Sequence, residues 1–247
     1  MTTFALKIIA IITMLIDHIA AIFIPQNTWI YIAGRVIGRL AFPIFVFLLV
    51  EGFYHTRSVP NYLKRLGIFA LISEIFFDLA FYNSFFQSSS GNIKTDLPKI
   101  FSDNQIFDTV VKRFMSYQNV FFTLFIGLAT IYFMSIIEKK YKDNMVYVNI
   151  INAIITIAAC LVAAVLRTDY SYKGVLLIVA FYLFRGSKIL LVLGILLINQ
   201  DVILAFAVFA MIPIAFYNGK KGKDIKYFFY TFYPAHLLLL FLISLAF

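Results

Sequence analysis

Ionisable side chains interrupt several long apolar segments of this sequence. A charged group that faces lipid at mid-bilayer costs about 2.5–3.5 kcal/mol, so such side chains are expected to face one another or a wet cavity. Interhelical ion pairs would explain any single one of them. Stability does not require buried ions, however, and the whole set together favours chemistry or transport. The set consists of Asp17, His18, Arg39, Glu51, Glu74, Asp78 and His236, with Arg35 and Asp169 at the segment edges.

The first apolar segment carries the most informative pair of these side chains. Lys7 and His18 are 11 residues apart, which on a helix returns to the same face within about 20° after a rise of roughly 16 Å. An ammonium at the membrane rim can hold a phosphate, and histidine is suited to proton transfer near neutral pH. The spacing indicates an ester- or amide-forming transfer in which His18 acts as general base or carries the acyl group. A hydrogen-bonded core histidine is the alternative.

The base in such a reaction needs a group that orients its ring. Asp17 is adjacent to His18 and points about 100° away on an ideal helix. Glu74 and Asp78 are four residues apart and share a helix face, so we expect one of them to orient His18. Ligation of a haem by His18 and His236 is a further alternative, although nothing else in the sequence marks a cofactor site. We expect no metal.

Other polar residues are candidates for supporting roles. We expect Arg39 or Asn119 to stabilise the oxyanion that forms during transfer, and Asn119 is also a candidate for contact with the donor. Glu51 and His55, at the end of the second apolar segment, are expected to line the entrance for the donor. His236 follows Pro234 in the last apolar segment and is expected to face the cavity or to pack against the bundle.

Three basic residues are candidates for binding the phosphates of a donor. Lys7 and Arg57 lie at segment ends, and Lys220 belongs to the run Asn-Gly-Lys-Lys-Gly-Lys at 218–223. Glycines in this run would also allow backbone N–H groups to approach a phosphate. The alternative is that these lysines only set the orientation of the chain in the membrane.

The elements that must position these residues are membrane-spanning helices. The 247-residue chain is 62% apolar and 13% charged, with a mean hydropathy of +0.92, whereas soluble domains are roughly half apolar and about a quarter charged. Its apolar runs do not alternate as the strands of a membrane barrel would. We therefore predict an all-α polytopic bundle of about 8–10 transmembrane helices in a single domain, 1–247. The apolar segments are 4–24, 33–53, 66–86, 119–137, 146–166, 172–184, 188–198, 201–217 and 227–247.

The charge distribution predicts the orientation of the chain. Its net charge of +9 is explained by loop lysines, so we expect no nucleic-acid partner. With the N-terminus in the cytoplasm, 13 of the 21 basic residues are cytoplasmic, namely Lys7 and those of the cytoplasmic connections. The positive-inside rule favours this orientation. The polar segment of about 87–118 is then an extracytoplasmic loop. Cys160 is the single cysteine, which excludes an internal disulfide and a cysteine zinc cluster.

Several blocks of the sequence resemble the TraX family. They are LKIIAIITMLIDHIAAIF at 6–23, GRLAFPIFVFLLVEGFYHTR at 38–57, LISEIFFDLAF at 71–81, NVFFTLFIGL at 119–128, FYNGKKG at 216–222 and KYFFYTFYPAHLLLL at 226–240. This family is known for acetylating the N-terminus of conjugative pilin and is similar to a wider group of transmembrane acyltransferases. In one family of that group, a basic residue, ten residues and a histidine form a motif that Lys7 and His18 match. Its cytoplasmic RxxR element is absent here, since Arg35 and Arg39 have a different spacing.

The resemblance implies an acyltransferase of the inner membrane that uses acetyl-CoA or another acyl-CoA as donor and no metal. The acceptor would be an amine or hydroxyl of a polypeptide such as pilin, of a glycan or of a lipid. Besides these ligands and the lipid bilayer, a second copy of the chain is a candidate partner. A transporter or channel uses buried charges equally well, and a scaffold for appendage assembly needs no chemistry, so both remain alternatives.

Overall fold

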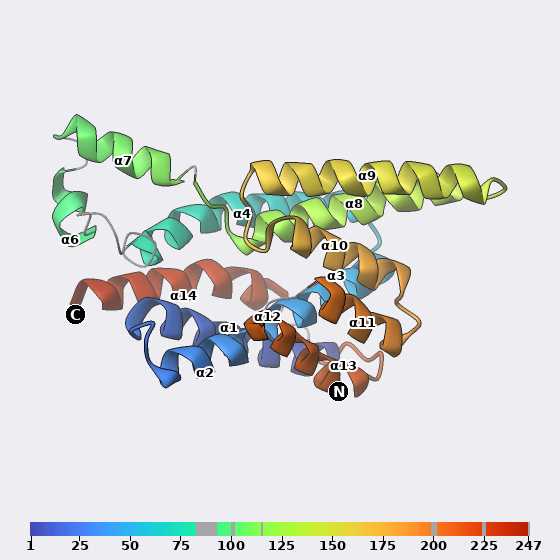
Figure 1. Ribbon diagram of the computed structural model, residues 1–247, viewed down its shortest axis with the longest axis horizontal. Helices are drawn as coiled ribbons and strands as arrows, with labels where there is room; N and C mark the ends of the chain where they lie inside the picture. The colour runs from blue at the N-terminus through green and yellow to red at the C-terminus, as the bar shows by residue number, and fades with distance from the viewer. Residues whose placement is uncertain (83–92, 100–101, 115, 199–201, 224–225, 247) are drawn as a thin grey trace.

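The computed structural model describes residues 1–82, 93–99, 102–114, 116–198, 202–223 and 226–246 (Figure 1). All the elements in these ranges are helices, which confirms the predicted all-α class. Ser88–Gly91, part of the predicted polar loop, lies outside the described residues. The elements are α1 (Thr3–Phe23), α2 (Trp29–Gly38), α3 (Ala41–His55), α4 (Val59–Ala80), α6 (Ile93–Asp96), η1 (Leu97–Lys99), α7 (Asn104–Phe114), α8 (Val120–Lys140), α9 (Met145–Val165), α10 (Ser171–Leu183), α11 (Lys188–Ile198), α12 (Val202–Ala205), η2 (Phe206–Ala210), α13 (Met211–Ala215) and α14 (Lys226–Ala246).

The helices have the dimensions of a multi-pass membrane protein. Among the described residues, five helical stretches are long and apolar enough to cross a bilayer: α1, α2 with α3, α8, α9 and α14. Helix α4 has 22 residues, which is also enough for a span, but it carries four charged side chains. Helices α10 and α11 and the stretch from α12 to α13 are shorter, as the sequence predicted for 172–184 and 188–198. Each of the nine apolar segments is therefore helical in the described part of the chain.

The second apolar segment begins earlier than predicted and contains a break. Thr28 caps α2 by accepting a hydrogen bond from the backbone N–H of Tyr31 at 3.2 Å, so the helix starts at Trp29 and not at residue 33. Arg39 and Leu40 form a turn between α2 and α3, in which the N–H of Leu40 donates to the Ile37 carbonyl at 3.2 Å. The first half, α2, packs along α1, while α3 continues into the centre of the bundle.

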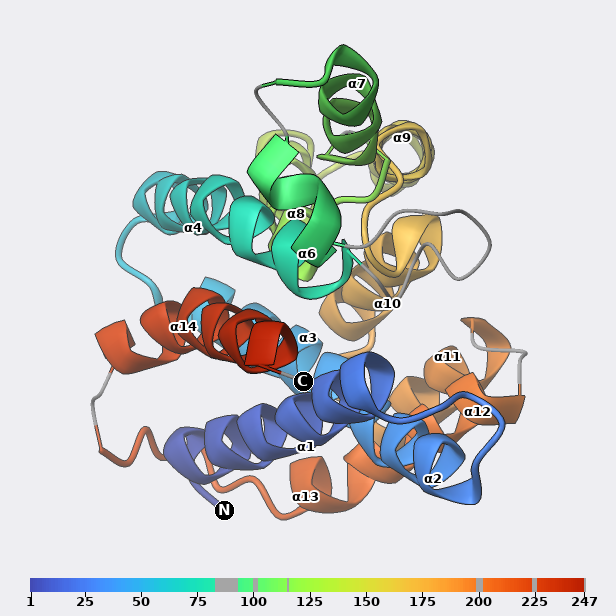
Figure 2. The ribbon, with the colours of Figure 1, turned by 90° about the vertical axis from the view of Figure 1, so that its left-hand side faces the viewer.

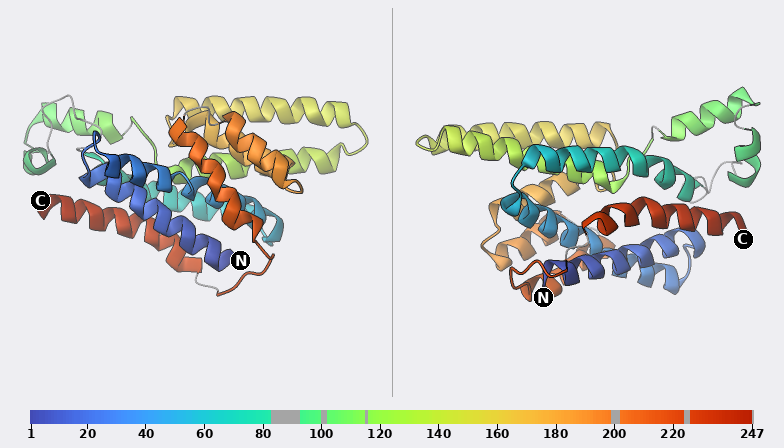
Figure 3. Two further views of the ribbon diagram at one scale, coloured as in Figure 1. Left: turned by 60° about the horizontal axis from the view of Figure 1, so that its bottom comes forward. Right: turned by 180° about the vertical axis from the view of Figure 1, so that it is seen from behind.

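Helix α14 returns to the beginning of the chain and packs between α1 and α4 (Figure 2). Helix α3 lies centrally, in contact with α1, α8 and α10, and α9 packs on the outer side of α8 and α10. The C-terminus lies at one end of the molecule, whereas the N-terminus lies inside its length and the connection between α8 and α9 forms the far end (Figures 1 and 3). We call the side of the bundle at which α1 begins the N-terminal end.

The segment 218–223 is tied to the N-terminal end by backbone hydrogen bonds. The N–H groups of Thr3 and Phe4 donate to the carbonyls of Lys220 and Lys221 at 2.9 and 3.1 Å. Gly222 adopts φ 71°, and a Cβ at this position would lie 2.8 Å from the hydroxyl of Thr2. The glycine therefore permits both the left-handed backbone and the close approach. As a result, this lysine run and Lys7 lie at the same end of the bundle.

The opposite end carries the described part of the segment predicted as a polar loop. Within 87–118 the structure has the short helices α6 and η1 and the longer α7, which extend beyond the end of α4 (Figure 1). This segment is thus partly helical, which its polar composition did not indicate.

Candidate functional site

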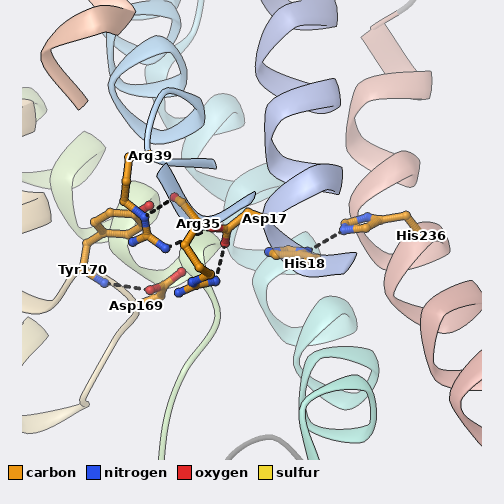
Figure 4. A network of polar contacts seen from close by, with 7 residues as sticks. All are labelled: Asp17, His18, Arg35, Arg39, Asp169, Tyr170 and His236. Carbon is orange, nitrogen blue, oxygen red and sulfur yellow. Dashed lines mark hydrogen bonds and ion pairs between the residues drawn. The ribbon is translucent and has the colours of Figure 1, made fainter. Parts of the chain in front are cut away.

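Two histidines from opposite ends of the sequence meet in the bundle. The Nδ1 atom of His18 on α1 lies 2.8 Å from the Nε2 atom of His236 on α14 (Figure 4). The two rings are nearly parallel, with centroids 5.0 Å apart, and both side chains are buried. The other nitrogen of His236, Nδ1, lies 2.9 Å from the backbone carbonyl oxygen of Phe232. His236 therefore binds the predicted base directly.

The prediction that a carboxylate of α4 orients His18 was wrong. Glu74 on α4 instead accepts hydrogen bonds from the backbone N–H of Asn119 at 3.0 Å and from its side-chain amide at 2.6 Å. Asp78, one turn further along α4, is buried. Among the described residues, the hydrogen bond from the ring of His18 goes to His236 and to no carboxylate.

Asn119 is the N-cap of α8, and its hydrogen-bonding groups are satisfied within the bundle. Its amide nitrogen donates to the Ala70 carbonyl at 2.8 Å and to Glu74, while its side-chain oxygen accepts from the N–H of Phe121 at 2.9 Å. Both amide hydrogens are used, and the side chain is fully buried. The prediction that Asn119 contacts the donor or the oxyanion therefore has no support in this arrangement.

Asp17 forms two ion pairs with α2. Its carboxylate oxygens lie 2.7 Å from Nη1 of Arg35 and 3.1 Å from Nη2 of Arg39. Arg39 also donates from Nε to the Arg35 carbonyl at 3.2 Å. Both carboxylate oxygens are occupied, so Asp17 holds α2 against α1 and does not bind His18. In Figure 4, His18 lies between this ion-pair group and His236.

A cavity of about 520 Å³ leads from the N-terminal end toward the two histidines. Lys7, Arg65 and Lys221 line it, and the Nε atom of Arg65 is buried without a hydrogen-bond partner among the described residues. Its inner wall includes Phe232 and Tyr233. These rings contact the histidines: Phe232 stacks on His236 with centroids 5.0 Å apart, and Tyr233 lies 6.2 Å from His18. Neither histidine lines the cavity, but each contacts an aromatic side chain that does.

The geometry confirms the predicted alignment of Lys7 and His18 on one face of α1. Both face α14, because the ammonium of Lys7 lies 4.6 Å from the centre of the Phe229 ring and His18 binds His236. Phe229 and His236 are seven residues apart, or about two helical turns, on the partner helix. The basic residue and the imidazole thus lie along one interhelical seam.

Glu51 and His55 line the same cavity, and their role at a donor entrance stays a prediction. The carboxylate of Glu51 is 2.6 Å from Nε of Arg185 and 3.6 Å from His55. Arg185 was not among the predicted site residues, because a single arginine between two apolar segments carries no distinguishing pattern. The pair joins the loop after α10 to α3 at the cavity wall.

Arg57 and Lys220 do not line this cavity. Arg57 lines a second cavity of about 660 Å³ beside it, together with Lys139, Tyr54 and Tyr182. The backbone carbonyl of Lys220 accepts a hydrogen bond from the N–H of Thr3. The neighbouring Lys221 lines the cavity. The predicted segment therefore reaches the cavity through Lys221, and phosphate binding by Lys220 stays a prediction.

The haem alternative does not fit the histidine pair. An iron between the two rings would form two metal–nitrogen bonds of about 2 Å each and so hold the nitrogens about 4 Å apart. The distance between Nδ1 of His18 and Nε2 of His236 is 2.8 Å. This distance is that of a hydrogen bond. No group of three or more His, Cys, Asp or Glu suited to a metal ion occurs in the part of the chain that the structure describes.

A strained segment lies next to the arginines of the site. Arg167, Tyr170 and Ser171 have positive φ angles of 51°, 63° and 47°, which cost free energy for residues other than glycine. The Tyr170 ring stacks on Phe42 with centroids 3.8 Å apart. Burial raises the pKa of the Asp169 carboxyl to about 6, against the opposing effect of nearby Arg39. Sequence reasoning noted Asp169 only as a charge at a segment edge.

Comparison with known sequences identifies the family. The sequence model described as TraX protein matches residues 3–97 and 103–244, which includes both histidines and all the cavity-lining segments. The chain belongs to the TraX family. The predicted resemblance is therefore confirmed over nearly the whole chain.

A curated relative has the same extent as this TraX-family chain. The probable fimbrial assembly protein FimC, serogroup H1, of Dichelobacter nodosus is 30% identical over 261 residues, which cover 97% of this chain and 94% of the relative. No solved structure matches the chain.

Proposed function

We propose that this TraX-family protein is a membrane-embedded acyltransferase that moves an acetyl or other acyl group from acyl-CoA to an amine or hydroxyl. The observation that supports it best is the seam between α1 and α14. Lys7 and Lys221 line the open cavity, and the His18–His236 pair lies behind its inner wall. A volume of about 520 Å³ is typical of a small-molecule site.

The donor would enter from the N-terminal end, which we propose to be cytoplasmic. Phosphates of CoA would bind Lys7, Lys221 and Arg65, whose buried Nε lacks a partner among the described residues. A buried donor without a partner costs about 1–3 kcal/mol, so an anionic ligand would relieve this cost. The acyl chain would extend toward Tyr233, whose ring must move aside for the thioester to reach His18.

The acceptor is proposed from the family and the relative. FimC is named as a fimbrial assembly protein, and a pilus or fimbrial subunit offers both an N-terminal amine and side-chain hydroxyls. We therefore propose that the transfer acts on such a subunit, or on a glycan or lipid of the same assembly process, in the cytoplasmic membrane. Residues 1–247 would together form one acyltransferase domain.

The test measures label transfer from radiolabelled acetyl-CoA in membranes that contain the protein and its native acceptor. Label in polypeptide, glycan and lipid fractions is counted separately for the wild type, His18→Ala and Cys160→Ala. Removal of a general base should lower the rate by about 10²–10⁴-fold, while Cys160, half-buried on the peripheral α9, serves as the matched control. Unchanged transfer in His18→Ala would refute the role of His18. Equal labelling of membranes with and without the protein would refute the acyltransferase itself and favour a scaffold or transporter.

A further inference from the structure

The hydrogen bonds around the two histidines determine which nitrogen carries each proton. The backbone carbonyl of Phe232 can only accept, so Nδ1 of His236 must donate the hydrogen bond of 2.9 Å. In the neutral ring, Nε2 of His236 is then an acceptor. His18 lies 2.8 Å from it through Nδ1, and Nδ1 of His18 must therefore be the donor. A neutral His18 with its proton on Nδ1 has a free lone pair on Nε2.

We propose that His236 is a positioning residue that holds His18 in the Nδ1–H tautomer, so that Nε2 of His18 is the atom that accepts the proton. This inference rests on the proposed acyl transfer for its chemical consequence. A chain from the Phe232 carbonyl through His236 to His18 fulfils the task that a carboxylate performs in other base-dependent sites. The tautomer is set by the hydrogen bond of the other ring nitrogen in both cases.

The packing around the pair supports a fixed orientation. Phe232 stacks on the His236 ring with a centroid distance of 5.0 Å, and His18 meets the same ring edge to edge through the hydrogen bond of 2.8 Å. Phe81 contacts the His18 ring edge-on at 5.2 Å. These contacts restrict rotation of either imidazole about its side-chain bonds, so the free nitrogen of His18 keeps one direction.

Two of the carboxylates considered for this role are held by other groups. The carboxylate of Asp17 is held by Arg35 and Arg39, and that of Glu74 by Asn119. The structure thus gives His18 a neutral partner. A carboxylate beside His18 would add a negative charge to the pair, whereas a second imidazole with a defined donor and acceptor fixes the tautomer without adding charge.

The proposed step conserves protons and electrons. As the nitrogen or oxygen of the acceptor forms its bond to the acyl carbon, its proton moves to Nε2 of His18. The carbon–sulfur bond of the thioester then breaks with its electron pair on sulfur, and the same proton passes from His18 to the CoA thiolate. The products are the acylated acceptor and CoA thiol, and His18 and His236 return to their initial tautomers.

The test reads the tautomer directly by NMR on full-length protein labelled with ¹³C,¹⁵N-histidine. The chain has three histidines, so His18 is assigned by the signal lost in His18→Ala. We expect the Nδ1–H form in the wild type. His236→Phe keeps a ring of similar shape but offers no acceptor, and it should shift His18 toward the Nε2–H form and slow transfer by about 10–100-fold, as for other orienting partners. His236→Gln offers a side-chain oxygen as acceptor and should restore both.

The outcomes separate the inference from the proposed function. An Nε2–H tautomer of His18 in the wild type would overturn the inference, as would equal loss of transfer in His236→Gln and His236→Phe with an unchanged tautomer. Size-exclusion profiles identify any variant that has lost its fold. Lack of transfer by the wild type would count against acyl transfer alone, because the NMR result does not depend on turnover.

Discussion

The close approach of α1 and α2 makes Gly34 a sensitive position. A Cβ added at Gly34 would lie 2.5 Å from the Cβ of Ala20 on α1, about 1.0–1.5 Å inside the usual carbon–carbon contact of about 3.5–4.0 Å. Ala20 has no side-chain rotamer with which to move away, so the two helices must separate. Gly38, one turn later, is similarly close to Asp17, and separation would therefore also strain the ion pairs of Asp17.

The expected cost of Gly34→Ala follows from this overlap. Overpacking costs about 1–3 kcal/mol, and the upper part of that range, about 2–3 kcal/mol, applies here because Ala20 cannot rotate away. The better helix propensity of alanine returns about 1 kcal/mol, which leaves a net loss of about 1–2 kcal/mol. For 150–250 residues, each kcal/mol shifts the Tm by about 2–4 °C, so the apparent Tm should fall by roughly 2–8 °C. Gly194→Ala is the matched control, since its Cβ would lie 3.5 Å from Ala180, an ordinary contact, and its Tm should stay equal or rise.

The assay is thermal unfolding of purified protein in detergent, followed by the fraction that remains monodisperse. The same preparations are compared for acyl transfer, because separation of α1 from α2 displaces Asp17 next to His18. An unchanged or higher Tm for Gly34→Ala, with the same value as Gly194→Ala, would refute the close packing of the two helices.

Three further predictions concern charge and sidedness. Because burial raises the pKa of Asp169 to about 6 above its usual value of about 3.9, the folded state binds the proton more tightly. Stability should therefore fall as pH rises from about 4 to 6, and thermal unfolding across this range should show a smaller slope in Asp169→Asn. Glu51→Gln removes the ion-pair partner of the partly exposed Arg185 and should lower the free energy of unfolding by about 0.5–1 kcal/mol. The measurement is a small decrease in Tm, and adding Arg185→Gln to the Glu51→Gln variant should lower the Tm no further. A cysteine at Lys221 should react only with reagents on the cytoplasmic side and one at Asn27 only from outside, and the reverse labelling would contradict the proposed donor entrance.

Properties that depend on neighbouring residues in the chain could be predicted from sequence. Apolar runs of sufficient length form helices in a membrane because backbone groups must be satisfied within the segment, and each predicted apolar segment is helical in the described residues. The shared face of Lys7 and His18 follows from helical periodicity alone. The lysine run 218–223 lies at the same end of the bundle as Lys7, and Lys221 rather than Lys220 lines the cavity.

The partners of the buried polar groups were decided by the tertiary structure. His236 lies 218 residues from His18, and no local pattern specifies that α14 packs between α1 and α4. The carboxylate of Glu74 was equally suited to orient His18, but the packing of α4 against α8 places it at the N-cap of α8, where Asn119 occupies it. Helix faces are encoded locally, because side-chain direction repeats every 3.6 residues. Which faces meet depends on how all the helices pack at once, and that packing determines the proton positions on which the proposed chemistry depends.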